Sequence, residues 1–209
     1  MRRTKEEAEI TRKNILDAAE ELFCSEGFEG ASLARIGEAA GVKRGAVHFH
    51  FTNKAGILVA LADRELVTLL ELYDRLAEGT ELDPLTALSN LLVETLHGFA
   101  TNPRRLAICR AMIWADFTLH PDDPGRTELL AFDDRLYRAM HGIVSDAAKR
   151  GQLGVPWAID TAAMVLHTFM CGLITSWSKT RTPERDLAVD GIDAVRELVE
   201  SFRARRAAE

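Results

Sequence analysis

The sequence has few cysteines and few tyrosines, and its apolar stretches are short. Its three cysteines, Cys24, Cys109 and Cys171, are widely spaced and form neither a CxxC metal motif nor an even-numbered disulfide framework. No apolar run approaches the length of about 20 residues that a membrane-spanning helix needs. The charged start MRRTKEEAE lacks the apolar region of a secretory signal. We therefore expect a cytoplasmic protein with reduced thiols and no membrane partner.

Several enzyme motifs are also absent. The sequence has no glycine-rich phosphate loop, no GxSxG and no HExxH. His48 and His50 stand two residues apart, but on a helix they point in different directions and no third ligand is near. We therefore expect no enzyme, no cofactor and no metal centre.

The net charge of −6 is unusual for a protein that binds nucleic acid. The first 54 residues carry nine basic and nine acidic side chains, so the rest of the chain carries the whole negative excess. Positive side chains are concentrated at the N-terminus, at Lys43–Arg44 and at Lys54. A small basic face on an acidic protein is therefore compatible with this composition.

The apolar residues repeat with helical spacing almost throughout, which predicts an all-α protein of about nine helices. The first helix is expected to begin at a capping box that starts with Thr4 and to end at Gly27. The later helices are expected at Lys54–Glu78, Pro84–Ala100, Arg104–Phe117, from the loop His120–Gly125 to Arg150, from Pro156 in a first turn to Lys179, and from Thr182–Pro183 to about Arg206.

Two short helices between Ser32 and Lys54 have the pattern of a helix-turn-helix. Ser32 is a suitable N-cap for the first helix, and Gly41 permits a left-handed turn before a second helix at 44–49. Thr52–Lys54 supplies capping oxygens for the next helix. Two helices joined by such a turn are typical of DNA-binding proteins. We expect residues 1–53 to form a DNA-binding domain and residues 54–209 to form a second, larger helical domain.

The stretch from Asn14 to Leu58 resembles the TetR family of repressors. The matching pieces are ILDAA at 15–19, LF at 22–23, GF at 27–28, SL at 32–33, Ile36, AAGV at 39–42, RGAV at 44–47, HF at 50–51 and NK at 53–54. KRGQL at 149–153 and GLI at 172–174 are similar to the AcrR-type branch, which controls multidrug efflux. The resemblance implies a three-helix N-terminal domain, a larger helical domain that binds a ligand, and a homodimer through the last two helices.

Two positions depart from the family pattern. Lys43 stands where the family has Ser or Thr, and lysine cannot accept the hydrogen bond that caps a helix. Its charge also opposes the helix dipole, although a DNA phosphate could offset this. His48 stands where the family has Tyr, and a histidine can still donate a hydrogen bond to phosphate.

The second short helix is expected to read DNA bases. Arg44 can make a bidentate contact with guanine, and Gly45 lets the backbone approach the groove. Phe51 is expected in the core and Phe49 on the DNA-facing surface, with core packing as its alternative. Arg2, Arg3 and Lys5 are candidates for a mobile arm. The predicted DNA-binding residues are Ser32, Lys43, Arg44, Gly45, His48, Phe49, His50 and Lys54.

The positions of AcrR-type drug pockets imply a mostly apolar ligand site. The predicted residues are Leu66, Leu92, Leu96, Cys109, Ile113, Trp114, Phe117, Leu136, Met140, His167, Met170, Cys171 and Ile174. Ordinary core packing is the alternative for each of them, and His167 fits a hydrogen-bonded core histidine as well as a ligand contact. We expect the effector to act through the helix that contains Cys109–Phe117.

The dimer is expected to use the apolar faces of the last two helices, as in a four-helix bundle. The predicted seam consists of Ala162, Ala163, Leu166, Met170, Leu173, Trp177, Leu187, Ile192, Val195, Leu198, Val199 and Phe202, with packing inside one subunit as the alternative.

The sequence therefore predicts a ligand-responsive repressor that binds a palindromic DNA operator as a dimer. A hydrophobic small molecule would release the repressor from DNA, and the repressor would control an efflux pump. A regulator that is independent of ligand or activates transcription stays open as an alternative, as does a helical enzyme.

Overall fold

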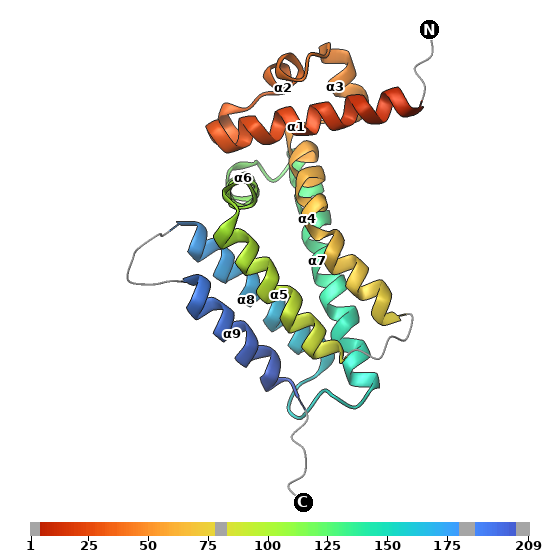
Figure 1. Cartoon of the computed structure of the whole chain (residues 1–209), viewed down its shortest axis with the longest axis vertical. Coiled ribbons are helices and arrows are strands. Elements are labelled where there is room, and N and C mark those ends of the chain that lie inside the picture. Colours follow the sequence, from red (N-terminus) through yellow and green to blue (C-terminus); the bar gives the residue numbers. More distant parts are fainter. Residues whose placement is uncertain (1–4, 78–82, 180–186, 204–209) are drawn as a thin grey trace, which may run out of the picture. The chain divides into compact units, whose positions relative to one another are not determined.

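The computed structural model describes residues 5–77, 83–179 and 187–203, and this part of the chain contains nine α-helices and no strand (Figure 1). The predicted all-α fold is confirmed. The helices are α1 (Lys5–Gly30), α2 (Leu33–Ala39), α3 (Arg44–His50), α4 (Lys54–Ala77), α5 (Pro84–Thr101), α6 (Pro103–Thr118), α7 (Pro124–Lys149), α8 (Ile159–Lys179) and α9 (Leu187–Ser201).

The helix ends follow the local signals closely, with a change at Gly27. This glycine has a φ of 73° and breaks the helical path of α1, but helical backbone resumes as far as Gly30. Phe28, just after the break, stacks on Phe23 with 6.0 Å between ring centroids. Arg2, Arg3, Thr4, Glu78, Thr182–Pro183 and Arg206, on which other predicted features depended, lie outside the described residues.

The prediction that Pro156 stands in the first turn of α8 is wrong. The helix begins at Ile159, because residues 154–158 are held in a loop against the end of α9. The Gly154 amide donates to the Phe202 carbonyl at 2.8 Å, and Trp157 Nε1 donates to the Ser201 carbonyl at 2.8 Å. The Trp157 ring also meets the Phe202 ring edge-on at 4.7 Å. These contacts outweigh the preference of proline for a helix start.

The chain divides into two compact units. The first comprises residues up to Glu65 together with Pro103–Phe132, and the second comprises Leu66–Asn102 and Asp133–Glu209. The first unit therefore holds α6 and the first part of α4 and α7 in addition to the three N-terminal helices. The division of DNA binding from ligand binding and dimerisation after residue 53 stays a prediction.

The first unit is built around α1, which packs against α2, α3 and α6. Its apolar stripe is buried at Ile15, Leu16, Ala19 and Phe23. Each large side chain buried in this way contributes about 1.5–3 kcal/mol relative to exposure. Ion pairs from Arg104 on α6 to Glu20 and Glu21 on α1 add a polar contact at the edge of this packing.

The second unit has its own core, which is built mainly from side chains of α5, α7, α8 and α9. In this unit α9 packs beside α5 and α8 (Figure 1). This core corrects the predicted dimer seam. Ala162, Ala163, Leu166, Met170, Trp177, Val195, Val199 and Phe202 are at most 9% exposed in the single chain, and Leu173, Ile192 and Leu198 pack against the same cluster. The side chain of Leu187 lies outside the described residues. Residues already buried within one subunit cannot form the seam, so the intramolecular alternative holds for them.

Helix α8 also corrects the expectation that no segment is long and apolar enough to span a membrane. Ile159–Ser178 meets that criterion by length and composition alone. Only 22% of the tested window is buried, although its most apolar face lies in the core of the second unit. Core helices of soluble proteins pass the same test, so this is weak evidence for a membrane span.

Candidate nucleic-acid interface

Helix α2 begins at Leu33 and is capped by Ser32, as predicted. The backbone of Ser32 is extended, with φ −128° and ψ 155°, and its Oγ accepts a hydrogen bond from the Arg35 amide at 3.3 Å. Arg35 in turn pairs through both of its terminal nitrogens with the two carboxylate oxygens of Glu26, and its Nη1 also donates to the Gly30 carbonyl at 2.8 Å. The hydrogen bond from Arg35 lowers the pKa of Glu26. These contacts fix the start of α2 against the end of α1.

The turn between α2 and α3 depends on Gly41. Its φ of +66° lies in the left-handed region, which glycine adopts without steric cost. The Gly41 amide donates to the Glu38 carbonyl at 3.0 Å, and the Val42 amide donates to the Gly37 carbonyl at 2.9 Å. This pair of bonds is a Schellman motif, which satisfies carbonyls at the end of a helix. The predicted left-handed turn is confirmed.

Helices α2 and α3 touch closely at Gly37 and Val47. A Cβ atom on Gly37 would lie 3.0 Å from Cγ2 of Val47 and 3.4 Å from the Val42 carbonyl oxygen. Val47 and Ile36 are fully buried beside this contact. The absence of a side chain at Gly37 therefore sets how near the second helix can lie to the first.

Helix α3 presents a polar and aromatic face to solvent. Arg44, Gly45 and His48 are exposed, and the Nε of Arg44 donates to Nε2 of His48 at 3.3 Å. Lys43, just before the helix, is exposed and makes no capping hydrogen bond through its side chain, as predicted. Its ammonium group therefore leaves the helix N-terminus uncapped. The outer face of α3 thus carries two permanent positive charges and an exposed imidazole that accepts a hydrogen bond from Arg44.

The aromatic residues at the end of α3 separate as predicted. Phe51 is 6% exposed and lies in the core, with the Arg12 guanidinium 5.4 Å from its ring centroid. Phe49 is 78% exposed, so its core alternative is excluded. The half-buried His50 meets Phe49 edge-on at 5.0 Å. A phenyl group this exposed is costly in water and is suited to an apolar contact with a partner.

The start of α4 is held by Asn53 and Lys54. The Oδ1 of Asn53 accepts from the Gly56 amide at 2.8 Å and caps the helix, while its Nδ2 donates to Glu128 on α7 at 2.8 Å. The ammonium of Lys54 donates to the carbonyls of Phe28 and Ala31 and lies 4.0 Å from the Phe28 ring centroid. Partial burial lowers the pKa of Lys54. Lys54 therefore stabilises the link between α1 and α4, and its contact with DNA stays a prediction.

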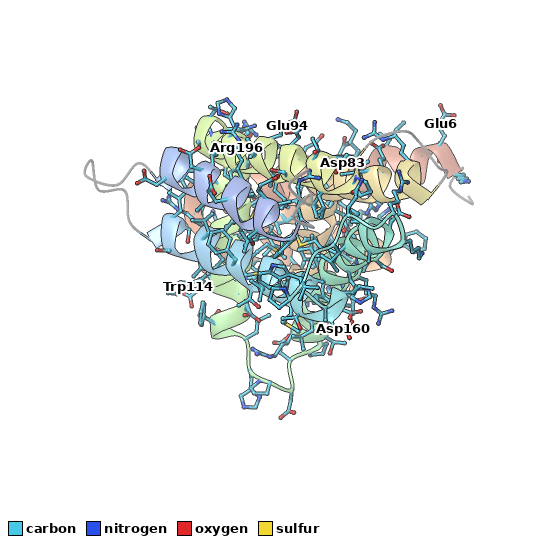
Figure 2. The ribbon with its side chains drawn as sticks, turned by 90° about the horizontal axis from the view of Figure 1, so that it is seen from below. Glu6, Asp83, Glu94, Trp114, Asp160 and Arg196 are labelled. Atoms are coloured by element: carbon cyan, nitrogen blue, oxygen red, sulfur yellow. The ribbon has the colours of Figure 1, made fainter. Side chains whose placement is uncertain are left out.

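The predicted ligand-binding residues occupy several environments. Leu92, Leu96, Met140 and Met170 are buried in the second unit, and Leu136 and Ile174 are half-buried beside them. In the first unit, Cys109 and Ile113 are half-buried, while Trp114 is 49% and Phe117 70% exposed. Figure 2 shows the Trp114 side chain pointing outward. The side chain of Leu66 lies outside the described residues, and the ligand site remains a prediction.

His167 has two polar partners, and only one of them could be predicted from the spacing of the sequence. Its Nε2 lies 3.1 Å from Oδ1 of Asp133 and 3.8 Å from Sγ of Cys171. The hydrogen bonds to Asp133 and Cys171 raise the pKa of His167 to about 10. Cys171 is one helical turn away and could be anticipated, but Asp133 comes from α7 and gives no local signal. His167 is thus a hydrogen-bonded histidine, and its contact with a ligand stays a prediction.

A capped helix, a glycine turn and a second helix with an exposed cationic face define a helix-turn-helix DNA-binding protein. Residues 15–61 match the sequence profile described as bacterial regulatory proteins, tetR family. The transcriptional regulator TtgR of Pseudomonas putida is 34% identical over 182 residues, covering 85% of this chain and 84% of TtgR. The transcriptional repressor BepR of Brucella suis is 30% identical over 204 residues, covering 98% and 97%. This chain belongs to the TetR family of bacterial transcriptional regulators.

A solved structure shows that the likeness extends over nearly the whole fold. The SmeT–triclosan complex superposes with a TM-score of 0.78 at 26% identity, covering 93% of this chain and 92% of SmeT. SmeT is described as the repressor of the multidrug efflux pump SmeDEF of Stenotrophomonas maltophilia. The comparisons confirm the predicted family and class, a helix-turn-helix transcriptional regulator of the TetR family.

Proposed function

We propose that this protein binds a palindromic operator as a homodimer and leaves it when a mostly apolar small molecule binds. The observation that carries the DNA-binding part is the outer face of α3, where Arg44, His48 and Phe49 are exposed on a helix that Gly37 and Val47 hold against α2. A rigid helix with exposed donors is what the major groove admits.

Each predicted DNA-binding residue has a defined task in the proposal. Arg44 donates two hydrogen bonds to a guanine edge, and Gly45 allows the backbone to approach the bases. Phe49 contacts a thymine methyl group, because an apolar ring can recognise that group in the major groove. His48 and His50 complete the base-facing set, and Ser32, Lys43 and Lys54 contact phosphates. Two such helices would contact half-sites about 34 Å apart.

The dimer is proposed to form through α8 and α9, but on a different face of α8 from the predicted seam. Thr161, Met164, Thr168, Gly172 and Ser176 are exposed at steps of three and four, and they form an uncharged stripe. Met164 is 53% exposed, and a Cβ on Gly172 would meet open space. Small residues along a stripe permit two helices to approach closely, and a second copy offers the same stripe.

We propose how the effector acts from the position of α6, and we propose its chemical class from the family. This helix packs against α1 in the first unit and is tied to it by Arg104, so a shift of α6 would move the helix that supports the DNA reader. A ligand can displace the equilibrium only if it binds the non-operator conformation more tightly. SmeT is seen with triclosan and represses an efflux pump. We therefore propose that the effector of this protein is apolar and that the gene it controls encodes an efflux pump. We also propose that the protein is cytoplasmic.

A fluorescence anisotropy assay tests this function with the full chain. The DNA is a labelled palindrome found upstream of the gene or its neighbour, and triclosan is the probe for release. We expect binding that unlabelled palindrome displaces and a scrambled duplex does not, with a weaker affinity when triclosan is present. Specific DNA binding that no apolar compound weakens would favour the ligand-independent alternative. Loss of all sequence preference would contradict the proposal.

A further inference from the structure

Three different ligand atoms meet at the junction of α7 and α8. The carboxylate of Asp133, the imidazole of His167 and the thiol of Cys171 bring one donor atom each within 4.8 Å of the others. The Nε2 of His167 lies in the middle of the set, 3.1 Å from Asp133 Oδ1 and 3.8 Å from Cys171 Sγ. All three residues belong to the second unit and lie apart from the helix-turn-helix.

The two separations measured from Nε2 of His167 match the edges of a tetrahedral metal site. Zinc bonds of about 2.0–2.1 Å to nitrogen, 2.0–2.2 Å to oxygen and 2.3 Å to sulfur give donor–donor edges of about 3.4 Å for N–O and 3.6 Å for N–S. The observed 3.1 Å and 3.8 Å differ from these by only a few tenths of an ångström. We propose that Asp133, His167 and Cys171 form a binding site for a thiophilic divalent cation of the zinc class.

The backbone and the neighbouring ring already organise the ligands. His167 and Cys171 are four residues apart on α8, so their side chains share one face of the helix. The Tyr137 ring meets the imidazole edge-on at 5.8 Å, which restricts its rotation. The His167 side chain is 12% exposed, whereas Asp133 is 54% exposed. Three protein ligands therefore converge with one side open to solvent for a fourth ligand, as in zinc sites that keep an exchangeable position.

The mixture of donors selects the class of cation. A thiolate and an imidazole favour zinc, cobalt or copper, whereas magnesium and calcium take oxygen ligands. On coordination the proton on Nε2 of His167 and the thiol proton of Cys171 both pass to solvent, because these ligands bind the cation in their deprotonated forms. The bound cation then joins α7 to α8 through three coordinate bonds.

The same two helices contain a matched control. The Nε2 of His141 on α7 lies 2.8 Å from Oδ1 of Asp160 on α8, labelled in Figure 2. This pair has the geometry of Asp133 and His167 with the two helices exchanged. Among the residues that the structure describes, no cysteine joins this pair to make a set of three donors. If a histidine and an aspartate alone sufficed, both pairs would bind the cation.

Cobalt(II) titration of the reduced, chelator-treated full chain tests the site. A thiolate bound to Co²⁺ gives a charge-transfer absorption band, and tetrahedral Co²⁺ gives intense visible bands. We expect both signals to saturate at one Co²⁺ per chain and to disappear when Zn²⁺ is added. The variants are Cys171→Ser, His167→Gln and Asp133→Asn, and the controls are Cys109→Ser and His141→Gln. Circular dichroism shows that each variant is folded.

The Cys171→Ser variant should lose the charge-transfer band. The other two ligand variants should bind Co²⁺ at least about tenfold more weakly than the parent chain. Loss of a residue that only supports a metal ligand already weakens binding by about tenfold, so loss of a ligand itself should cost no less. The controls should bind as the parent chain does. A charge-transfer band that survives in Cys171→Ser, or equal weakening by His141→Gln, would overturn the assignment. So would the absence of any Co²⁺ signal in the parent chain. Operator binding is measured separately, so either proposal can fail alone.

Discussion

Cγ2 of Val47 lies 3.0 Å from the point where a Cβ on Gly37 would stand. Valine is stiff about its first torsion and cannot turn this methyl away easily. We expect Gly37→Ala to separate α2 from α3 and to reduce the free energy of unfolding by about 1–3 kcal/mol, as overpacking usually does. Urea denaturation monitored by circular dichroism measures this loss.

Gly45→Ala is the matched control, since its Cβ would meet nothing within 4 Å. Alanine is favoured over glycine in a helix by about 0.5–1 kcal/mol, so this variant should be more stable than the parent. It should nevertheless bind the operator more weakly, because the added methyl group stands between the backbone and the bases. Equal stability losses in both variants would contradict the role of Gly37.

Lys43 offers a test that separates folding from DNA binding. Lys43→Ser supplies the missing cap of α3 and should raise the free energy of unfolding by about 0.5–2 kcal/mol. The same variant removes a proposed phosphate contact, so the slope of log affinity against log salt concentration should fall by about 1. Lys43→Ala should change the slope equally but give no stabilisation. An unchanged slope in both variants would show that Lys43 does not contact phosphate.

The exposed stripe of α8 predicts the effect of a charge on dimerisation. Thr168→Arg places a long cation in a stripe that a second copy would cover, and burying an unpaired charge is strongly unfavourable. We expect this variant to elute as a monomer when its mass is measured by light scattering after size exclusion. Thr127→Arg, at an exposed position of α7 in the first unit, is the control and should remain dimeric. A dimeric Thr168→Arg variant would place the interface elsewhere.

Asp83 predicts how stability depends on pH. Partial burial raises the pKa of Asp83, but hydrogen bonds from Arg203 and from the Thr86 amide outweigh this, so the pKa lies below its ordinary value of 3.8. The ionised form is thus favoured in the folded protein. Its contribution is present above pH 3.8 and is lost as the pH falls through the lower folded value.

Asp83→Asn keeps an oxygen that can cap α5 but removes the charge opposite Arg203, which lies 2.7 Å away. We expect the variant to be less stable near neutral pH by about 1 kcal/mol or less, as for other partly exposed pairs. The difference from the parent should shrink on acidification. Unfolding curves collected along a pH series measure it, and a difference that stays constant with pH would exclude the charge as its cause.

Local sequence signals predicted the features that depend on neighbouring residues. Ser32 caps α2, Gly41 forms the left-handed turn, and Lys43 leaves α3 uncapped, because each of these depends on a few adjacent backbone groups. The apolar spacing also separated Phe51 from Phe49 correctly.

Contacts between distant segments could not be predicted. Asn53 meets Glu128, and Asp133 meets His167, through the packing of helices that lie far apart in the sequence. For its buried members, the predicted seam was wrong for a related reason. An amphipathic helix buries its most apolar face within its own subunit first, so Leu166 and Met170 lie in the core and smaller residues of α8 are left exposed.

The most direct test of DNA reading by α3 is the operator affinity of Arg44→Ala, measured by fluorescence anisotropy at a fixed salt concentration. We expect a loss of about 1–3 kcal/mol, as for other bidentate base contacts, together with weaker discrimination at one position of each half-site. Arg138→Ala, which removes an exposed arginine from α7, should bind as the parent chain does. Unchanged specific binding by a folded Arg44→Ala variant would contradict the assignment of α3 as the reading helix.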